Sequence, residues 1–260
     1  MGHTHLATLP GTRRWKHVVH LLDEGAPADA VVTASAVAAE KDFAVAADDP
    51  VLVEAVRLLA LMPQAARTAD FGERMRALGV DVPDAPILGD LTVGTSRALE
   101  EVLRRPSGRT DFGEIVRRAL LGTMSALIGD GLPGLFEADA EDVRVAVAKM
   151  GRPNDFSRVV RAFFGRVTAD TLASWLDRTL STRLGADLRF KTLGERDAFD
   201  RALDQYCIEA TRIIHEFSGA WYGKTLYRDG TITSERAAAF AAVAFRKITE
   251  ELQRKRDAHA

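Results

Sequence analysis

The strongest constraint on the fold is the spacing of apolar residues between Glu195 and Phe217. Within this stretch they recur every three or four positions, at Phe199, Ala202, Leu203, Tyr206, Ala210, Ile213 and Phe217. This is the period of an α-helix that buries one face. The other face is rich in Asp, Glu and Arg. The pattern therefore predicts a long amphipathic helix that packs against other helices.

Similar spacing predicts helices over most of the chain. Local start signals support it: Thr12 as a cap, Asp49 followed by a proline, and Asp111 followed three residues later by Glu114. No segment alternates apolar and polar residues convincingly, except at 224–233. We therefore expect an all-α protein, an irregular multi-helix bundle of about ten helices.

The end of the long helix is expected near two glycines. Gly219 and Gly223 are both suitable as helix stops. The Asp229-Gly230 pair that follows is a tight-turn signal. The sequence therefore predicts a short hairpin or loop near 224–233, before the last helix.

Two helical regions are expected, joined at the proline-containing segment 80–86. We predict an N-terminal helical region over 1–82 and a C-terminal helical region over 83–260, packed as one globular unit. Asp-Phe pairs at Asp70, Asp111 and Asp155 each open an expected helix, and Asp197 precedes Phe199 by two positions. Their spacing of roughly 41–44 residues leaves stacked helical hairpins of the HEAT type open as an alternative.

Composition favours a cytoplasmic protein. The net charge is −2, so nothing demands a polyanionic partner. The single cysteine excludes an internal disulfide and fits a reducing compartment. No run of roughly 18 apolar residues predicts a membrane span. Richness in Ala, Arg, Val and Asp, with few Lys, suggests a bacterial source.

The common catalytic motifs are missing. Asp-Phe-Gly occurs at Asp70 and Asp111, but the glycine-rich loop and catalytic loop of a kinase do not. The chain has no phosphate-binding loop and no GxSxG element, so we predict no cofactor. His17, His20 and Glu24 share one face of an expected helix, and His3 and His5 lie nearby. We interpret that face as solvated and predict no metal site. Cys207 lies on the apolar stripe and is expected to be a small core residue.

The most distinctive local string is Trp221-Tyr222-Gly223-Lys224. With His215 and Glu216 it forms our candidate binding site, because stacked aromatics and a lysine could hold a base and a phosphate. The alternative interpretation is structural. In that case Trp221 plugs the end of the helix, Tyr222 is half exposed and Lys224 is solvated.

Charge is distributed unevenly along the chain. Residues 151–191 carry a net charge of +4, from eight Arg or Lys and four Asp, and residues 23–57 carry −6. A contact between these regions, within the chain or between subunits, is the simplest explanation. A nucleic-acid-binding region over Arg152–Lys191, with the Arg254–Arg256 tail, is an alternative that we do not favour.

No catalytic set is assembled in the sequence, whereas helix faces are abundant. We therefore expect a non-enzymatic protein–protein interaction subunit or adaptor of a bacterial cytosolic complex, with a protein partner or self-association and no membrane. Two alternatives stay open. One is an enzyme or ligand-binding protein with a site over His215–Lys224, and the other is a nucleic-acid-associated protein that uses residues 152–191.

Overall fold

The computed structural model describes residues 11–105, 110–133, 138–185 and 188–259. The protein is 79% helical, with eleven helices in these residues. The predicted all-α class is therefore confirmed. Within the described ranges, β structure is limited to one isolated parallel bridge between Leu184 and Phe190.

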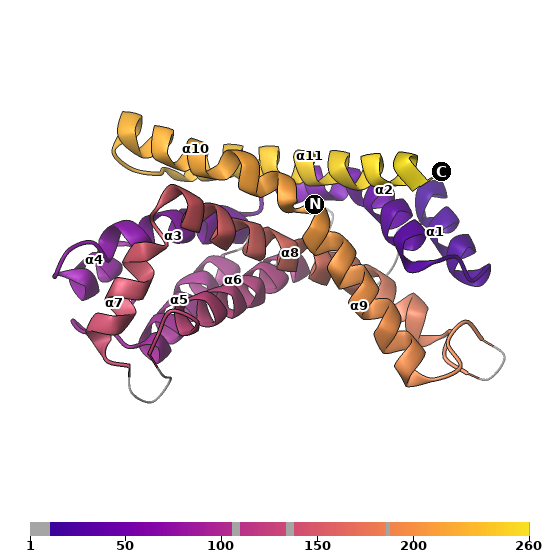
Figure 1. Cartoon of the computed structure of the whole chain (residues 1–260), viewed down its shortest axis with the longest axis horizontal. Coiled ribbons are helices and arrows are strands. Elements are labelled where there is room, and N and C mark those ends of the chain that lie inside the picture. The colour runs from indigo at the N-terminus through magenta and orange to yellow at the C-terminus, as the bar shows by residue number, and fades with distance from the viewer. Residues whose placement is uncertain (1–10, 106–109, 134–137, 186–187, 260) are drawn as a thin grey trace.

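The helices follow one another through short connections (Figure 1). Their bounds are α1 Arg13–Asp23, α2 Ala28–Ala46, α3 Pro50–Ala65, α4 Phe71–Ala77, α5 Leu88–Arg104, α6 Asp111–Gly129, α7 Ala140–Lys149, α8 Pro153–Ser181, α9 Leu193–Ala210, α10 Arg212–Asp229 and α11 Ser234–His259.

The central element is α8, a helix of 29 residues that packs against α6, α9 and α10. It begins at Pro153. Proline has no backbone N–H, and this costs nothing in the first turn, where N–H groups make no hydrogen bond within the helix. Phe156, Phe163 and Phe164 are fully buried along it. Each buried ring of this size stabilises the fold by roughly 1.5–3 kcal/mol, so α8 anchors the core.

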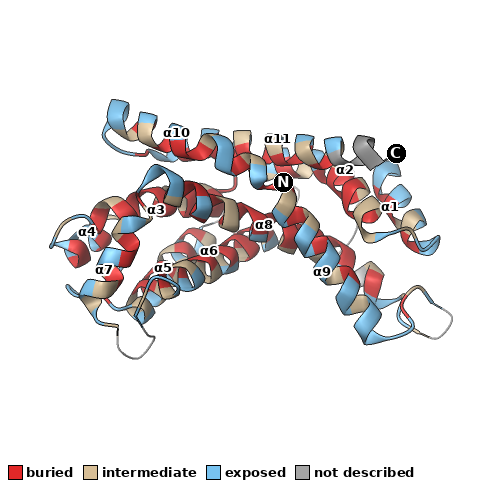
Figure 2. Ribbon diagram, viewed as in Figure 1, coloured by how far each residue is buried: buried red, intermediate tan, exposed pale blue. Residues whose placement is uncertain are grey.

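The last helix packs against the beginning of the chain. α11 lies on α2 and α3, and beside α10 (Figure 1). Figure 2 shows buried residues on the sides of α3, α8 and α11 that face other helices. Phe43 of α2 and Phe245 of α11 stack with ring centroids 5.1 Å apart. Buried residues on both sides of position 83 belong to one cluster, and the division into 1–82 and 83–260 stays a prediction.

The long helix expected from Glu195 is in fact two helices. α9 ends at Ala210 and α10 begins at Arg212, and Figure 1 shows that the two run in different directions. Thr211 between them is fully buried, and its hydroxyl donates to the Ile208 carbonyl at 2.7 Å. A threonine that bonds back to its own helix competes with the regular ladder. The apolar spacing continues across the bend, so periodicity alone could not reveal it.

The predicted stops at Gly219 and Gly223 are wrong, because α10 runs through both to Asp229. It ends at Gly230, whose φ of 70° is the left-handed conformation that glycine adopts readily. The sequence predicted a hairpin or loop near 224–233. In the structure, residues 224–229 belong to α10 and only 230–233 form a short loop.

Gly219 has a packing role instead. A methyl group on it would lie 2.7 Å from the Pro153 carbonyl oxygen and 2.8 Å from Ser157 Oγ, so α10 and α8 approach closely there.

The Asp-Phe spacing does not mark a repeated hairpin. The helices that carry these pairs are α4, α6, α8 and α9, with 7, 19, 29 and 18 residues. A helical-hairpin repeat would place helices of similar length in equivalent positions. The bundle is irregular, as the sequence analysis predicted, and is not a stack of similar hairpins.

Two helix starts are linked through their caps. Asp49 caps α3, and its Oδ1 accepts from the Val51 backbone N–H at 2.8 Å. Its Oδ2 accepts from the Thr110 hydroxyl at 2.7 Å, and Thr110 Oγ1 in turn caps α6 by accepting from Gly113 N–H. Burial raises the pKa of Asp49, and the hydrogen bonds that it accepts from the Thr110 hydroxyl and from the Val51 and Leu52 backbone N–H groups oppose that shift. The starts of α3 and α6, 61 residues apart, therefore share one hydrogen-bonded unit.

We expect Asp49→Ala to lower the free energy of unfolding by about 0.5–2 kcal/mol, the usual cost of a lost cap. Thr110→Ala should cost a similar amount. Because the two residues bond to each other, the double variant should depart from additivity by at least about 0.5 kcal/mol in urea unfolding. Thr12, which caps α1 separately, is the control, and Asp49→Ala with Thr12→Ala should be additive. Additive Asp49 and Thr110 effects would contradict the link.

Candidate functional site

The five predicted binding residues, His215, Glu216, Trp221, Tyr222 and Lys224, all lie on α10. Consecutive helical residues are about 100° apart around the axis, so a cluster in sequence spreads around the helix. The structure leaves His215, Glu216 and Lys224 exposed and buries Tyr222.

Tyr222 is a core residue with a satisfied hydroxyl. It is 1% exposed and stacks on Phe156 of α8, with centroids 3.9 Å apart and planes 11° apart. Its hydroxyl donates to the Ala60 carbonyl at 3.0 Å and accepts from Gln64 Nε2 at 2.5 Å, so it joins α10 to α3. Burial raises the pKa of this phenol, and the Gln64 hydrogen bond opposes the shift. The expectation that Tyr222 is half exposed is wrong.

Trp221 is half-buried and packs its ring against Phe240 of α11, with centroids 4.2 Å apart. It lies eight residues before the end of α10, so the expectation that it plugs a helix end is also wrong. Lys224 follows Tyr222 by two positions, about 200° around the helix, and points away from it. The aromatic and basic members of the string are therefore divided between the core and the surface.

No family model, curated protein or solved structure matches this chain. Functional assignment therefore depends on the other concave surfaces and charged clusters of the molecule.

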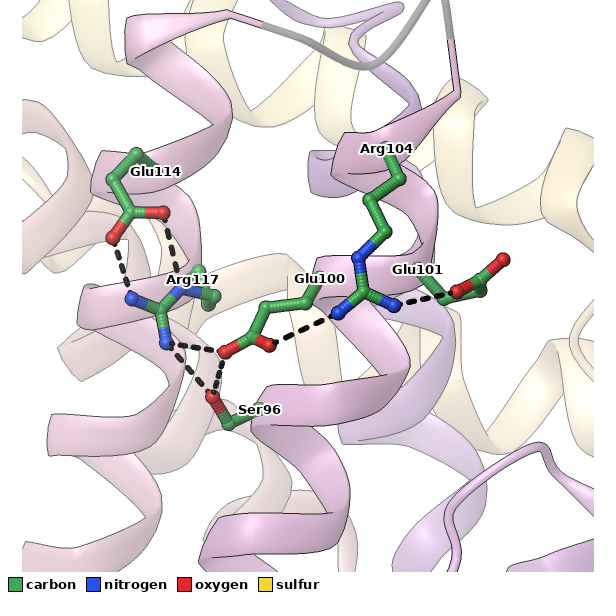
Figure 3. A network of polar contacts seen from close by, with 6 residues as sticks. All are labelled: Ser96, Glu100, Glu101, Arg104, Glu114 and Arg117. Atoms are coloured by element: carbon green, nitrogen blue, oxygen red, sulfur yellow. Dashed lines mark hydrogen bonds and ion pairs between the residues drawn. The ribbon is translucent and has the colours of Figure 1, made fainter.

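A network of ion pairs joins α5 to α6 (Figure 3). Both oxygens of Glu114 accept from Arg117, at 2.5 and 3.0 Å. Arg117 Nη1 also donates to Ser96 at 2.7 Å and lies 3.4 Å from Glu100, which in turn pairs with Arg104. The Arg117 hydrogen bond lowers the pKa of Glu114. Because the polar atoms of Arg117 are engaged within the protein, we interpret the network as a clasp between two helices.

A polar pocket of about 580 Å³ lies between α6, α8 and α9. Its lining residues are Arg118, Asp170, Ala173, Ser174, Asp177, Arg196 and Asp200. Arg196 is held by two carboxylates, with Asp177 at 3.1 Å and Asp200 at 2.9 Å.

Burial raises the pKa of Asp170, the nearby Asp204 adds to the shift, and Arg118 and Arg166 oppose it. In the described part of the chain, Ser174 bonds to no base, so the pocket holds charge without an activated nucleophile.

An apolar groove of about 460 Å³ lies between α2 and α11. The Phe43 and Phe245 pair lines it, and Ala44 and Ala242 lie exposed beside these rings. Its charged and amide-bearing lining residues are Glu40, Arg246, Glu250 and Gln253. Phe43 and Phe245 are only 1% and 2% exposed, so the accessible apolar surface comes from Ala44, Ala242 and the half-buried Val243. Small residues of this kind allow another backbone to approach closely. The sequence signal was present, since both helices are rich in alanine, but alanine spacing does not say which pair of helices will meet.

The basic region 152–191 follows α8 and the chain after it, over about 43 Å of helix alone. Its far end is engaged with α1. Arg183 pairs with Asp23 at 2.7 Å, and Arg189 donates to the Leu22 carbonyl at 3.2 Å and to the Ala26 carbonyl. The predicted contact between the basic and acidic regions is confirmed at the Arg183–Asp23 pair. In the tail, Arg254 lies 3.6 Å from Glu251, and the Arg256 side chain is outside the described residues.

The remaining candidates are isolated side chains. Cys207 is fully buried, as predicted for a core residue. His17 and His20 are exposed, and His20 Nε2 lies 3.2 Å from Glu24. His3 and His5 lie outside the described residues. No group of three or more His, Cys, Asp or Glu side chains suited to a metal was found in the described ranges. Over those ranges, no helix is long and apolar enough to cross a membrane.

Proposed function

We propose that this chain is a non-enzymatic interaction subunit, and that it binds an amphipathic helix of a partner protein in the groove between α2 and α11. The observation that carries the proposal is the groove itself, in which the exposed Ala44 and Ala242 and the half-buried Val243 form an accessible apolar surface beside the buried Phe43–Phe245 pair. Grooves of this kind receive the apolar face of a helix through residues spaced three and four apart.

Charges at the groove edge support the same proposal. Glu40, which also pairs with Arg14, lies on the α2 side, and Arg246 and Glu250 lie on the α11 side, so charges of both signs stand at the groove edge. Edge charges of both signs orient a bound helix more than they add affinity. The single buried cysteine and the Ala- and Arg-rich composition support a bacterial cytosolic setting.

The alternatives have weaker support. The side chains of a ligand or catalytic site over His215–Lys224 do not point toward one another, because Tyr222 is buried in the core while His215 and Lys224 are exposed. For the nucleic-acid alternative, Arg183 and Arg189 are engaged with α1 and the turn after it. The polar pocket between α6, α8 and α9 has no activated nucleophile that would favour an enzyme.

The proposal predicts that Ala242→Arg abolishes partner binding without unfolding the protein. Ala242 is exposed, so the fold tolerates the change, whereas the arginine occupies the groove. The measurement is affinity purification from the native host with mass spectrometry. Ala220→Arg, at an exposed alanine of α10, is the matched control and should retain the partner. Light scattering of the purified chain identifies a second copy as the partner.

A photo-crosslinking residue at position 242 should give a crosslink with the co-purified partner, and one at position 220 should not. Retention of the partner by both arginine variants would contradict the groove as the binding site. Crosslinks of equal yield at both positions would contradict it as well.

A further inference from the structure

A second groove, between α1 and α2, differs in chemistry from the one between α2 and α11. It has a volume of about 580 Å³, within the usual range for small-molecule sites. One side is apolar: Leu21, Ala30, Ala34 and Val37 line it, and each remains partly exposed. The other side is basic and consists of Arg13, Arg14 and His17 of α1.

The basic residues differ in how they are engaged. Arg14 donates to the Val37 carbonyl at 2.9 Å and pairs with Glu40 at 3.1 Å, so it ties α1 to α2. Arg13 and His17 are exposed and have no hydrogen bond or ion pair with the described part of the chain. Their polar atoms are available to a ligand at the edge of an apolar surface.

The charge of α1 adds to this asymmetry. Its first turn holds two arginines and no acidic residue, although the start of a helix favours negative charge. Glu40 neutralises Arg14, which leaves the Arg13 charge without a partner in the described residues. A carboxylate placed beside Arg13 and His17 would supply the missing negative charge, and an alkyl chain would cover the partly exposed Leu21, Ala34 and Val37.

We propose that the α1–α2 groove binds a free monoalkyl carboxylate, with its head group at Arg13 and His17 and its chain along Leu21, Ala30, Ala34 and Val37. The guanidinium of Arg13 can donate two parallel hydrogen bonds to the carboxylate, and the imidazole of His17 can donate a third. This proposal does not rest on protein binding at the other groove: the two share no lining residue, although Arg14 of this groove pairs with Glu40 of the other.

The test is calorimetric titration of the full-length chain with laurate, at concentrations where laurate is monomeric. We expect saturable binding with one laurate per chain. Dodecyltrimethylammonium and dodecyl maltoside, which carry an alkyl chain of nearly the same length, should bind at least tenfold more weakly. Equal binding of all three would overturn the proposal, because it would show that only the alkyl chain matters.

Three variants locate the site. Arg13→Gln with His17→Gln should weaken laurate binding by tenfold or more, the scale of one charge-assisted hydrogen bond. Lys16→Gln, at an exposed lysine of α1 that does not line the groove, should leave the affinity within about twofold. Ala34→Phe should fill the groove and remove binding. If circular dichroism shows that Ala34→Phe does not fold, the test rests on the variant with Arg13→Gln and His17→Gln.

Two further outcomes would overturn the proposal. One is an equal loss of affinity in Lys16→Gln, which would indicate diffuse attraction to a basic helix. The other is flotation with phosphatidylglycerol vesicles without any binding of monomeric laurate, which would assign the surface to lipid head groups in a bilayer. Laurate binding without flotation supports the free carboxylate.

Discussion

Tyr222→Ala should lower the free energy of unfolding by about 3–5 kcal/mol, as large-to-small changes of buried aromatic residues do. The change removes a ring that is 1% exposed and stacked on Phe156. It also leaves the Ala60 carbonyl and the Gln64 amide without the hydroxyl that both now contact. Urea unfolding followed by circular dichroism measures the loss.

Neighbouring variants separate the ring from the hydroxyl. Tyr222→Phe keeps the stacking and removes the hydroxyl, so it should cost about 1–3 kcal/mol. Trp221→Ala should cost less than Tyr222→Ala, because Trp221 is half-buried. Lys224→Ala should change stability very little, since it removes an exposed charge with no ion pair in the described residues. A larger loss for Trp221→Ala than for Tyr222→Ala would contradict the core position of Tyr222.

Gly219→Ala should destabilise the protein by about 1–3 kcal/mol, although alanine is the better helix former. The added methyl group would meet the Pro153 carbonyl oxygen at 2.7 Å, and backbone atoms cannot turn aside as a side chain can. α10 and α8 would have to separate along their whole contact. The measurement is again urea unfolding.

Gly223→Ala is the matched control on the same helix. A methyl group there would meet nothing within 4 Å, and the position is helical. Alanine should therefore stabilise the protein by about 0.5–1 kcal/mol, because glycine loses more conformational freedom on folding. Opposite signs at two glycines four residues apart are the specific expectation. Stabilisation by both changes would show that α10 and α8 are not in close contact at Gly219.

Local signals in the sequence predicted local structure well. The caps at Thr12 and Asp49 lie where the sequence placed them. The start of α6 was predicted one residue late, because Thr110 rather than Asp111 is the cap. The apolar periodicity also predicted the all-α class correctly, because residues about one turn apart lie on the same face of a helix. These features depend on residues within a few positions of one another.

Features that depend on distant residues could not be predicted. Glycine is common where helices end, so the sequence predicted a stop at Gly219, and only the nearby Pro153 carbonyl shows why glycine is needed there. The partners of Tyr222 are 158 and 162 residues away in the sequence, so its burial could not be inferred from its neighbours. The candidate site had the same weakness, because five residues close in sequence were assumed to share a surface. The α1–α2 groove was missed because His17 was considered only as a metal ligand, and Arg13 was not considered at all.

The packing of α11 on α2 and α3 has a consequence for synthesis on the ribosome. The chain emerges from its N-terminus, and Ser234 is added 188 residues after Ala46. At about 5–20 residues per second, this delay lasts roughly 10–40 s. During this delay, the surface of α2 and α3 against which α11 packs remains exposed. The nascent chain therefore presents an Ala- and Val-rich apolar surface to chaperones until α11 has been synthesised, and this part of the core closes only after that.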